Sequence, residues 1–384
     1  MPRVLLLRAE LLPASETFVV AQAAALGRYD AGFAGLKRLP GGLDVTVIQR
    51  GVVAVLDGDG GWGGNAARLA YARAGIARGF AQKLAAWKPD VAHVHFATDA
   101  CAFLPVLRGL GVPFVVTLHG YDAGLSDEAH ETSAIGRMFL RRRVALWREA
   151  AGFLCVSEHL RRVAVERGFP EDKLWVHVTG IPVREKVRSD RPREPVVLFV
   201  GRLVEKKGCR VLLEAWKAVE QEVPSAWLVV IGDGPLRAEL EGWVRANLRQ
   251  CEFVGARTQA EVREWMDRAA VLAAPSVRAA NGDTEGLPTV VLEAMERGLP
   301  VVASDGTGAE EAVAAGETGF LTAQGDVEGL AETLVGLLRN GEQARRLGAS
   351  GRRRVEERFD IGRQTVRLEA IYDAVRGTAG ECHG

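Results

Sequence analysis

Three things are scarce or missing in this sequence: cysteine, an excess of charge of one sign, and long apolar runs. The five cysteines are scattered over 384 residues without a C-x-x-C pair, which argues against a disulfide framework and a zinc site. Basic and acidic residues number 49 each, so the net charge gives no indication of a nucleic-acid partner. No run approaches the roughly 18 apolar residues of a membrane span, and the start MPRVLLLRAELLP is too short and too charged for a signal peptide. We therefore expect a reduced, cytoplasmic protein.

What the sequence does contain is an alternation of short apolar runs and helical patterns, which is typical of parallel sheets with crossover helices. The length suggests two domains. The charged, proline-bearing segment REKVRSDRPREP, at 184–195, is predicted to link a first domain, 1–183, to a second, 196–359. The fold class is therefore α/β with two doubly wound sheets. The candidate strands are Val4–Leu7, Val45–Gln49, Val91–His95, Phe114–Leu118, Gly152–Val156, Trp175–Val178, Val196–Val200, Ala226–Ile231, Cys251–Val254, Val271–Ala274 and Pro300–Ala303.

The segment NGDTEGLPTVVLEAME, at 281–296, places two carboxylates around the start of one predicted helix. Pro288 is predicted to be the first helical residue, because its φ is already helical and its missing N–H costs nothing there. Glu285 then precedes the helix, and Glu293 lies about one and a half turns inside it. A helix start favours phosphate and carboxylates accept from sugar hydroxyls, so the pattern indicates a nucleotide sugar. The alternative is a buried helix with a solvated glutamate at each end.

A second motif, VVLFVGRLVEKKG at 196–208, joins an apolar strand to a basic loop before a predicted helix at 211–219. The loop carries Gly201, Arg202, Lys206 and Lys207. In open α/β sheets this end of a strand faces the ligand crevice. Arginine and lysine there suit a diphosphate whose charge grows as a bond breaks. The alternative is an ordinary solvated loop.

Together these motifs resemble the retaining glycosyltransferases of family 4, which have the GT-B fold. The resemblance rests on GRLVEKKG, IGDGP at 231–235, EGLPTVVLE, VVASDGTGAEEAV at 301–313 and GETGFLTAQGD at 316–326, with HVHF at 93–96 and TLHGYDA at 117–123 in the first half. It covers nearly the whole chain. It implies two Rossmann-like domains that face each other across a cleft, an acceptor-binding first domain, and a last helix (360–376) that crosses back to pack on the first domain.

The resemblance also implies roles for residues. Glu293 is expected to bind the ribose of a UDP- or GDP-sugar, and Glu285 the hydroxyls of the transferred hexose. Asp233, Gly234 and Arg257 are expected to flank the base. The groups expected at the diphosphate are the backbone of Gly286, Leu287, Pro288 and Thr289, with Gly201, Arg202 and Lys207. Neither a metal nor a cofactor is expected, and the leaving diphosphate would help to deprotonate the acceptor on the same face of the sugar.

Three histidines, His93, His95 and His119, lie near two predicted strand ends. A metal site is not expected from them, because no acidic residue has metal-ligand spacing. The resemblance implies that His119 lies near the anomeric carbon. Asp122 would lie beside it, either facing substrate or holding the loop.

The loop PASETFV, at 13–19, departs from the glycine pair that many family members carry there. Ser15 is a predicted N-cap. The loop is similar to those of relatives that build cell-surface polysaccharides and lipid-linked glycans. Ser15, Glu16 and Thr17 are therefore candidates for acceptor contact, and the alternative is a capped helix with an exposed Glu16.

The arginine-rich stretch GRMFLRRRVALWR, at 136–148, predicts an amphipathic helix. Such a helix suits peripheral contact with an anionic membrane and a lipid-linked acceptor, although ordinary surface helices have the same pattern. The function expected is sugar transfer to a glycan, lipid-linked or small-molecule acceptor. Two alternatives stay open: a non-hydrolysing sugar-nucleotide epimerase of the same fold, and a non-enzymatic nucleotide-sugar-binding protein.

Overall fold

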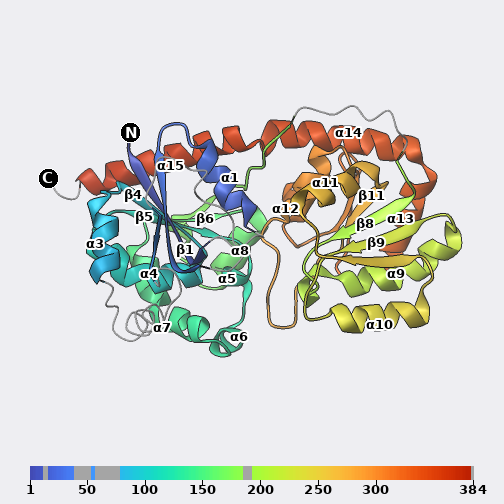
Figure 1. Cartoon of the computed structure of the whole chain (residues 1–384), viewed down its shortest axis with the longest axis horizontal. Coiled ribbons are helices and arrows are strands. Elements are labelled where there is room, and N and C mark those ends of the chain that lie inside the picture. The colour runs from blue at the N-terminus through green and yellow to red at the C-terminus, as the bar shows by residue number, and fades with distance from the viewer. Residues whose placement is uncertain (12–15, 39–52, 57–77, 185–192, 382–384) are drawn as a thin grey trace. The chain divides into compact units, whose positions relative to one another are not determined.

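The computed structural model describes residues 1–11, 16–38, 53–56, 78–184 and 193–381 (Figure 1). It divides into two compact units. The first comprises Met1–Pro182 together with Ile361–Gly384, and the second comprises Val183–Asp360. Each unit contains one parallel sheet with helices around it, which confirms the expected fold class.

The first unit has a seven-stranded sheet in the order β3-β2-β1-β4-β5-β6-β7. The inner strands β4 and β5 are buried at every residue, as expected for a parallel sheet covered on both faces. Chain order reverses between β1 and β4, and such a reversal is where open α/β sheets bind ligands, at the carboxyl ends of the strands. The strands are β1 (Arg3–Leu11), β2 (Asp30–Arg38), β3 (Val53–Val55), β4 (Val91–His95), β5 (Phe114–Leu118), β6 (Gly152–Cys155) and β7 (Leu174–Val176).

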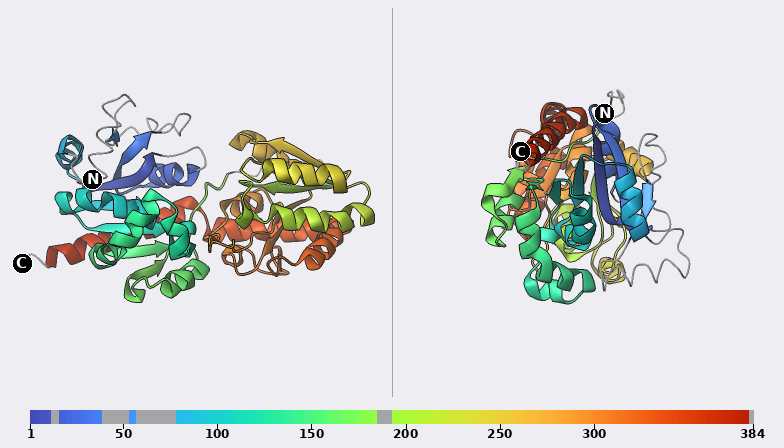
Figure 2. Two further views of the ribbon diagram at one scale, coloured as in Figure 1. Left: turned by 90° about the horizontal axis from the view of Figure 1, so that it is seen from below. Right: turned by 90° about the vertical axis from the view of Figure 1, so that its left-hand side faces the viewer.

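The helices of the first unit connect these strands and cover the sheet (Figure 2). The largest contact between helices joins α4 and α7, which bury Phe103 and Phe139. The helices are α1 (Thr17–Ala25), α3 (Arg78–Ala86), α4 (Ala97–Leu110), α5 (Tyr121–Gly124), α6 (Asp127–Glu131), α7 (Ala134–Glu149), α8 (Glu158–Glu166) and α15 (Ile361–Glu381), with a 3-10 turn, η1 (Glu171–Lys173).

The last helix, α15, packs against α1 and β4, as the expected fold requires. Its apolar residues Leu368, Tyr372 and Val375 join the core around Val4 and Leu6 of β1. Although α15 follows the second unit in sequence, it completes the first.

The second unit has a six-stranded sheet in the order β10-β9-β8-β11-β12-β13, with the reversal of chain order between β8 and β11. Trp216 of α9 is its largest fully buried side chain. The strands are β8 (Val196–Val200), β9 (Trp227–Ile231), β10 (Cys251–Gly255), β11 (Val271–Ala274), β12 (Val301–Ser304) and β13 (Phe320–Thr322). The helices are η2 (Glu205–Lys207), α9 (Cys209–Glu222), α10 (Arg237–Asn247), α11 (Gln259–Arg268), α12 (Thr289–Glu296), η3 (Ala309–Glu311), α13 (Val327–Arg339) and α14 (Gly341–Arg358).

Several details differ from the sequence-based expectations. Strands β2, β3 and β13 were not expected, and the strand expected at Val45–Gln49 falls outside the described residues. Helix α12 begins one residue later than predicted, because Pro288 is its N-cap with an extended ψ of 103°. The N-cap of α1 is Glu16, not Ser15, and the Glu16 side chain does not cap the helix. Ser15 itself lies outside the described residues.

Helices long and apolar enough to cross a membrane are absent from the described part of the chain. This finding agrees with the short, mixed apolar runs of the sequence.

Candidate functional site

In the second unit, two loops leave the carboxyl ends of adjacent strands at the reversal of chain order. One follows β8 and carries Arg202, Lys206 and Lys207, and the other follows β11 and carries Glu285. The adjacency of β8 and β11 therefore brings together the two motifs that the sequence separates by about eighty residues.

The two loops are joined by backbone contacts. The Val277 N–H donates to the Lys206 carbonyl at 2.8 Å, and the Ala280 N–H donates to the Glu205 carboxylate at 3.0 Å. Gly208 has a φ of +64°, and a Cβ there would lie 1.7 Å from the Pro275 carbonyl oxygen. Only glycine therefore allows this close approach between the loops.

Two lysines and two carboxylates form a compact charge cluster between these loops. Lys207 Nζ lies 3.0 Å from Glu285 Oε2, and Lys206 Nζ lies 3.0 Å from Asp283 Oδ1 and 3.8 Å from Glu285 Oε1. Glu285 is 7% exposed, so its charge depends on these partners. Burial opposes its ionisation, but Lys207 and Lys206 outweigh burial and hold the pKa of Glu285 below its usual value.

Glu285 keeps unused hydrogen-bonding capacity. Its Oε1 is buried and accepts no hydrogen bond from the described residues, and the same holds for the hydroxyl oxygen of Thr284. Buried polar atoms of this kind call for an explanation. An ionised, buried carboxylate with one oxygen that accepts no hydrogen bond is suited to accept from hydroxyl groups of a ligand.

The second glutamate of the motif, Glu293, is the fifth residue of α12, and its partners differ from those of Glu285. It hydrogen-bonds with Gln259 and is close to Arg263, both on α11. Burial raises its pKa, and Arg263 and Gln259 reduce that rise. Its carboxylate is therefore a second acceptor, near the middle of the helix that follows Glu285.

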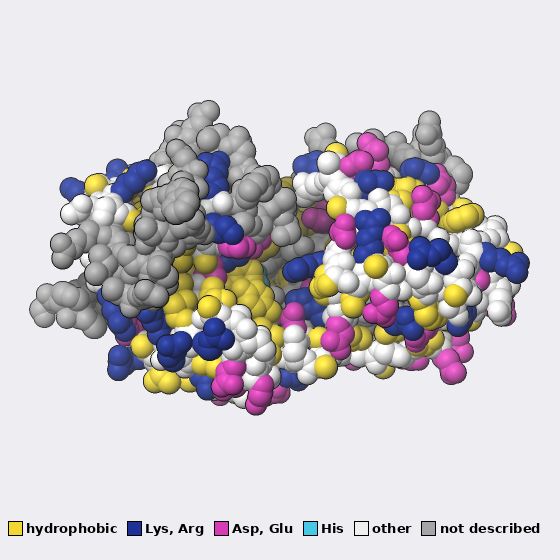
Figure 3. All heavy atoms as spheres, turned by 60° about the horizontal axis from the view of Figure 1, so that its bottom comes forward, with side chains coloured by type: hydrophobic (Ala, Val, Ile, Leu, Met, Phe, Trp, Pro, Cys, Tyr) yellow, Lys and Arg dark blue, Asp and Glu magenta, His cyan; other side chains and the backbone are white. Residues whose placement is uncertain are grey.

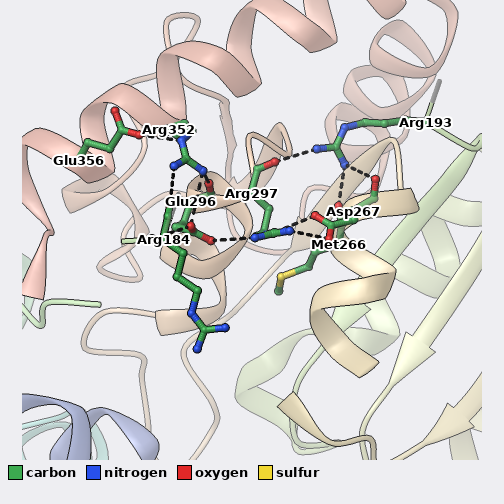
Figure 4. A network of polar contacts seen from close by, with 8 residues as sticks. All are labelled: Arg184, Arg193, Met266, Asp267, Glu296, Arg297, Arg352 and Glu356. Atoms are coloured by element: carbon green, nitrogen blue, oxygen red, sulfur yellow. Dashed lines mark hydrogen bonds and ion pairs between the residues drawn. The ribbon is translucent and has the colours of Figure 1, made fainter. Parts of the chain in front are cut away.

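A polar network fixes the far end of α12 (Figure 4). Arg352 of α14 donates to the Glu296 carbonyl at 2.5 Å and to the Arg184 carbonyl at 2.6 Å. Arg297 makes a two-pronged ion pair with Asp267 at 2.6 and 2.7 Å. The network joins α12 to α11 and α14, so the helix that carries Glu293 is anchored at its carboxyl end.

The remaining residues predicted for this unit lie at neighbouring strand ends. The Gly201 N–H donates to the Ile231 carbonyl, and Arg202 beside it is exposed. Asp233 accepts from the Gly234 N–H and from Arg237, and Arg257 is exposed 3.8 Å from Glu261. The last predicted set, Gly286, Leu287, Pro288 and Thr289, forms the entry to α12.

In the first unit, His119 follows β5 and is partly exposed. Asp122 is fully buried and accepts from the N–H groups of Ala97, His119 and Gly120 at 2.9–3.0 Å. Of the two roles left open for Asp122, the geometry therefore gives it the second: it holds the loop that carries His119.

Glu16 is buried and occupied by an ion pair. Arg8 Nε donates to Glu16 Oε2 at 2.7 Å, and the same guanidinium bonds to Asp99. Phe96 lies under Arg8, 4.2 Å from ring centre to Cζ, with an unusual φ of +74°. Burial raises the pKa of Asp99 to about 6, although Arg8 opposes the rise. Phe96 is thus a bulky residue at positive φ beside a buried charge pair. Strained backbone positions of this kind cluster at functional sites.

Some of these residues escaped the sequence analysis. Arg8 interrupts the apolar run VLLLRAEL, and a charge inside a buried strand was the available signal. Asp99 and Asp283 had none, because their partners, Arg8 on β1 and Lys206 on η2, are distant in sequence. Among the described residues, no group of three His, Cys, Asp or Glu side chains is arranged to hold a metal ion.

Comparisons with known proteins concern the family of the chain. The family model "Glycosyl transferases group 1" matches residues 183–354, and "Glycosyltransferase Family 4" matches 41–185.

Two curated relatives are similar along much of the chain. The amylovoran biosynthesis glycosyltransferase AmsK of Erwinia amylovora is 33% identical over 212 residues, which cover 54% of this chain and 52% of that protein. The chain thus matches about half the length of AmsK. The phosphatidyl-myo-inositol mannosyltransferase of Mycobacterium leprae is 30% identical over 294 residues, with 74% of each chain covered.

Among solved structures, Anabaena HepE in complex with UDP and glucose has a TM-score of 0.78 at 20% identity. The match covers 97% of this chain and 100% of HepE. At this identity the likeness concerns the fold.

Proposed function

Because this chain belongs to the glycosyltransferases described by the group 1 and family 4 models, we propose that it moves a hexose from a UDP- or GDP-sugar to an acceptor with retention of anomeric configuration. The observation that supports this most is the buried Glu285. One of its oxygens accepts no hydrogen bond, and Lys206 and Lys207 lie beside it where the chain order of the strands reverses. A sugar diphosphate needs both hydroxyl acceptors and phosphate cations in one place.

In this proposal Glu285 accepts from hydroxyls of the transferred sugar and Glu293 from those of the ribose. Lys207, Arg202 and the N–H groups at the entry to α12 bind the diphosphate. His119 contacts the transferred sugar. The loops at Asp233, Gly234 and Arg257 flank the base.

The proposed reaction breaks the bond between the anomeric carbon and the diphosphate oxygen. The acceptor oxygen bonds to the same face of that carbon, and its proton passes to the departing diphosphate. The cations stabilise the negative charge that develops on the diphosphate, so no metal ion and no cofactor are required.

The acceptor is proposed to be a glycan or a lipid-linked glycan, since AmsK acts in amylovoran biosynthesis. Helix α7 exposes Arg137, Arg141, Val144 and Arg148 along one side, opposite its buried Phe139 and Leu146. Lysine and arginine side chains, in dark blue, are visible on the lower left of Figure 3. We propose this stripe as a peripheral contact for an anionic membrane at the inner face of the cell membrane.

The test is release of nucleoside diphosphate by the purified protein, with and without candidate acceptors, after a thermal-shift screen of nucleotide sugars has identified the donor. Glu285→Gln and His119→Ala should each lower turnover more than tenfold while the affinity for the free nucleoside diphosphate changes little, because sugar contacts act mainly in the transition state.

The alternatives predict other products. An epimerase would convert the donor to its epimer without releasing diphosphate. A sensor would bind a nucleotide sugar and never release diphosphate, and either outcome would contradict the transferase proposal.

A further inference from the structure

Three imidazole rings from β4 and from the end of β5 lie one beside the next. The ring centres of His93 and His95 are 4.5 Å apart at 26°, and those of His95 and His119 are 5.2 Å apart at 25°. His95 Nδ1 lies 3.0 Å from His119 Nε2, within hydrogen-bond distance. The protonation of His119 is therefore coupled to that of His95.

The inner end of this histidine row is fixed. His93 Nδ1 is 2.6 Å from the Tyr372 hydroxyl, and His93 Nε2 is 2.6 Å from Thr117 Oγ1. His95, which is 1% exposed, stacks on this fixed ring. Its own ring consequently has little freedom to turn.

The surroundings of His95 decide which nitrogen carries the proton. His95 Nε2 is buried, and no described residue hydrogen-bonds to it. If His119 donated from Nε2, a neutral His95 would have to keep its hydrogen on Nε2, as an unpaired buried N–H. Unpaired buried N–H groups are rarer than unused acceptor lone pairs, so the proton belongs on His95 Nδ1. His119 Nε2 then accepts, and the neutral His119 carries its hydrogen on Nδ1.

The charged groups around His119 keep it neutral. Burial lowers its pKa well below the usual value, and Arg8 on β1 and His93 on β4 lower it further. Asp99 on α4 is engaged by Arg8, Asp122 on α5 accepts from the backbone of the His119 loop, and Phe18 on α1 contributes an apolar ring. The hydrogen bond from neutral His95 therefore determines which nitrogen of the neutral His119 carries its hydrogen.

We propose that His95 is a positioning residue that holds His119 as the Nδ1–H tautomer, so that His119 offers an N–H donor, and no lone pair, to an oxygen of the transferred sugar. The proposal rests on the proposed function for the identity of that ligand. It assigns His119 a donor role, in contrast to a proton-abstracting base.

The first measurement uses the wild-type protein with ¹⁵N-labelled histidine and long-range ¹H–¹⁵N spectra, which distinguish the two tautomers. We expect the hydrogen on Nδ1 in both His95 and His119. A hydrogen on His119 Nε2 would overturn the proposal. This readout does not require activity, so it separates failure of the inference from failure of the proposed function.

The second measurement uses three variants at position 95. His95→Leu removes the donor, and His95→Gln places its amide near the former Nε2. His95→Asn retains an N–H donor near the former Nδ1. We expect at least a tenfold loss of kcat in the first two, with unchanged nucleoside diphosphate affinity, and recovery of most of the loss in His95→Asn. Equal losses in all three would contradict the proposal.

The matched control is His130→Asn, on α6. His130 is also a buried imidazole of the first unit, 3% exposed and packed against Phe139. We expect it to leave the His119 signals and kcat unchanged. A loss of kcat as large as in His95→Leu would mean that replacing any buried histidine of the first unit has this effect. That result would contradict a positioning role for His95.

Discussion

Nζ of Lys207 lies 3.0 Å from Oε2 of Glu285, so the cation proposed for the diphosphate and the carboxylate proposed for the sugar neutralise each other. Lys207 and Glu285 therefore form one ion pair, and a ligand that binds either side chain changes the interactions of the other. A ligand with phosphate at one end and hydroxyls at the other can satisfy both partners together, which phosphate alone does not.

The first prediction concerns the cations. Lys207→Ala and Arg202→Ala should each lower kcat/KM by an amount that corresponds to about 2–4 kcal/mol of transition-state stabilisation. This is the usual effect of losing one group that stabilises developing charge. Steady-state kinetics with the identified donor measure the effect. Arg245→Ala, which removes an exposed cation on α10, is the control. Activity within twofold of wild type would make Lys207 and Arg202 surface charges only.

The second prediction concerns Glu293. Glu293→Ala should weaken binding of both the donor and the free nucleoside diphosphate, because both contain the ribose that Glu293 is proposed to bind. Calorimetric titration compares the two ligands. Glu332→Ala, an exposed glutamate on α13, should leave both affinities unchanged. Unchanged nucleotide affinity in Glu293→Ala would remove this residue from the ribose.

The third prediction is metal independence. Turnover should persist in EDTA, since lysine, arginine and the N–H groups of the α12 entry are proposed to neutralise the diphosphate. Parallel assays with EDTA, magnesium and manganese test this. Activity that EDTA abolishes and magnesium restores would show that the proposed cations are insufficient.

The fourth prediction concerns the network at the end of α12. Arg352 and Glu296 are 9% and 5% exposed. Removal of Arg352 takes one of two arginines from the Glu296 carboxylate and removes the donor of the Glu296 and Arg184 carbonyls. Arg352→Ala should lower the free energy of unfolding by about 3–5 kcal/mol, measured by chemical denaturation. Arg353→Ala, an exposed neighbour on the same helix, should change it by less than about 0.5 kcal/mol. Similar values for both would show that the Figure 4 network adds no stability.

The fifth prediction concerns pH. Burial raises the pKa of Asp99 to about 6, above its value of roughly 3.9 in an unfolded chain. Between these two values the folded state holds more protons than the unfolded state. The contribution of Asp99 to stability is therefore fully present below about pH 3.9 and is lost as the pH rises through 6.

Carboxyl ¹³C titration should place the Asp99 midpoint near pH 6. Asp99→Asn should make the decline in unfolding free energy between about pH 4 and 6 shallower. An Asp99 midpoint near 4, or an unchanged slope in the variant, would contradict this account.

Much of the fold was predictable because parallel strands buried on both faces read as continuous apolar runs, as in VVLFV of β8. Strand β2, DAGFAGLKR, was not recognised because glycine and alanine replace the large apolar residues that mark a strand. Gly35 has to be small, since a Cβ there would lie 2.8 Å from Leu11 Cβ. What distinguishes β2 as a strand is its close packing against β1, and this packing is seen only in the structure.

The candidate site was predictable where its residues are contiguous. Glu285 and Lys207 were identified from short motifs, but their pairing depends on the adjacency of β8 and β11. Arg8 and Asp99 lie 91 residues apart, and no local pattern joins them. For Glu16, the sequence allowed an exposed or an acceptor-facing side chain, whereas the fold buries it against Arg8.

The first unit is assembled from two separate pieces of chain, and this affects how the protein is made. Leu368, Tyr372 and Val375 complete a core whose other members, such as Val4 and Leu6, leave the ribosome more than 350 residues earlier. Until α15 is synthesised, the nascent first unit exposes the apolar surface that this helix covers. The second unit is continuous in sequence and can close first. Domains usually mature in the order in which they are translated. Here the two pieces of the first unit flank the second in sequence, so we expect the first unit to become stable only after α15 has been made.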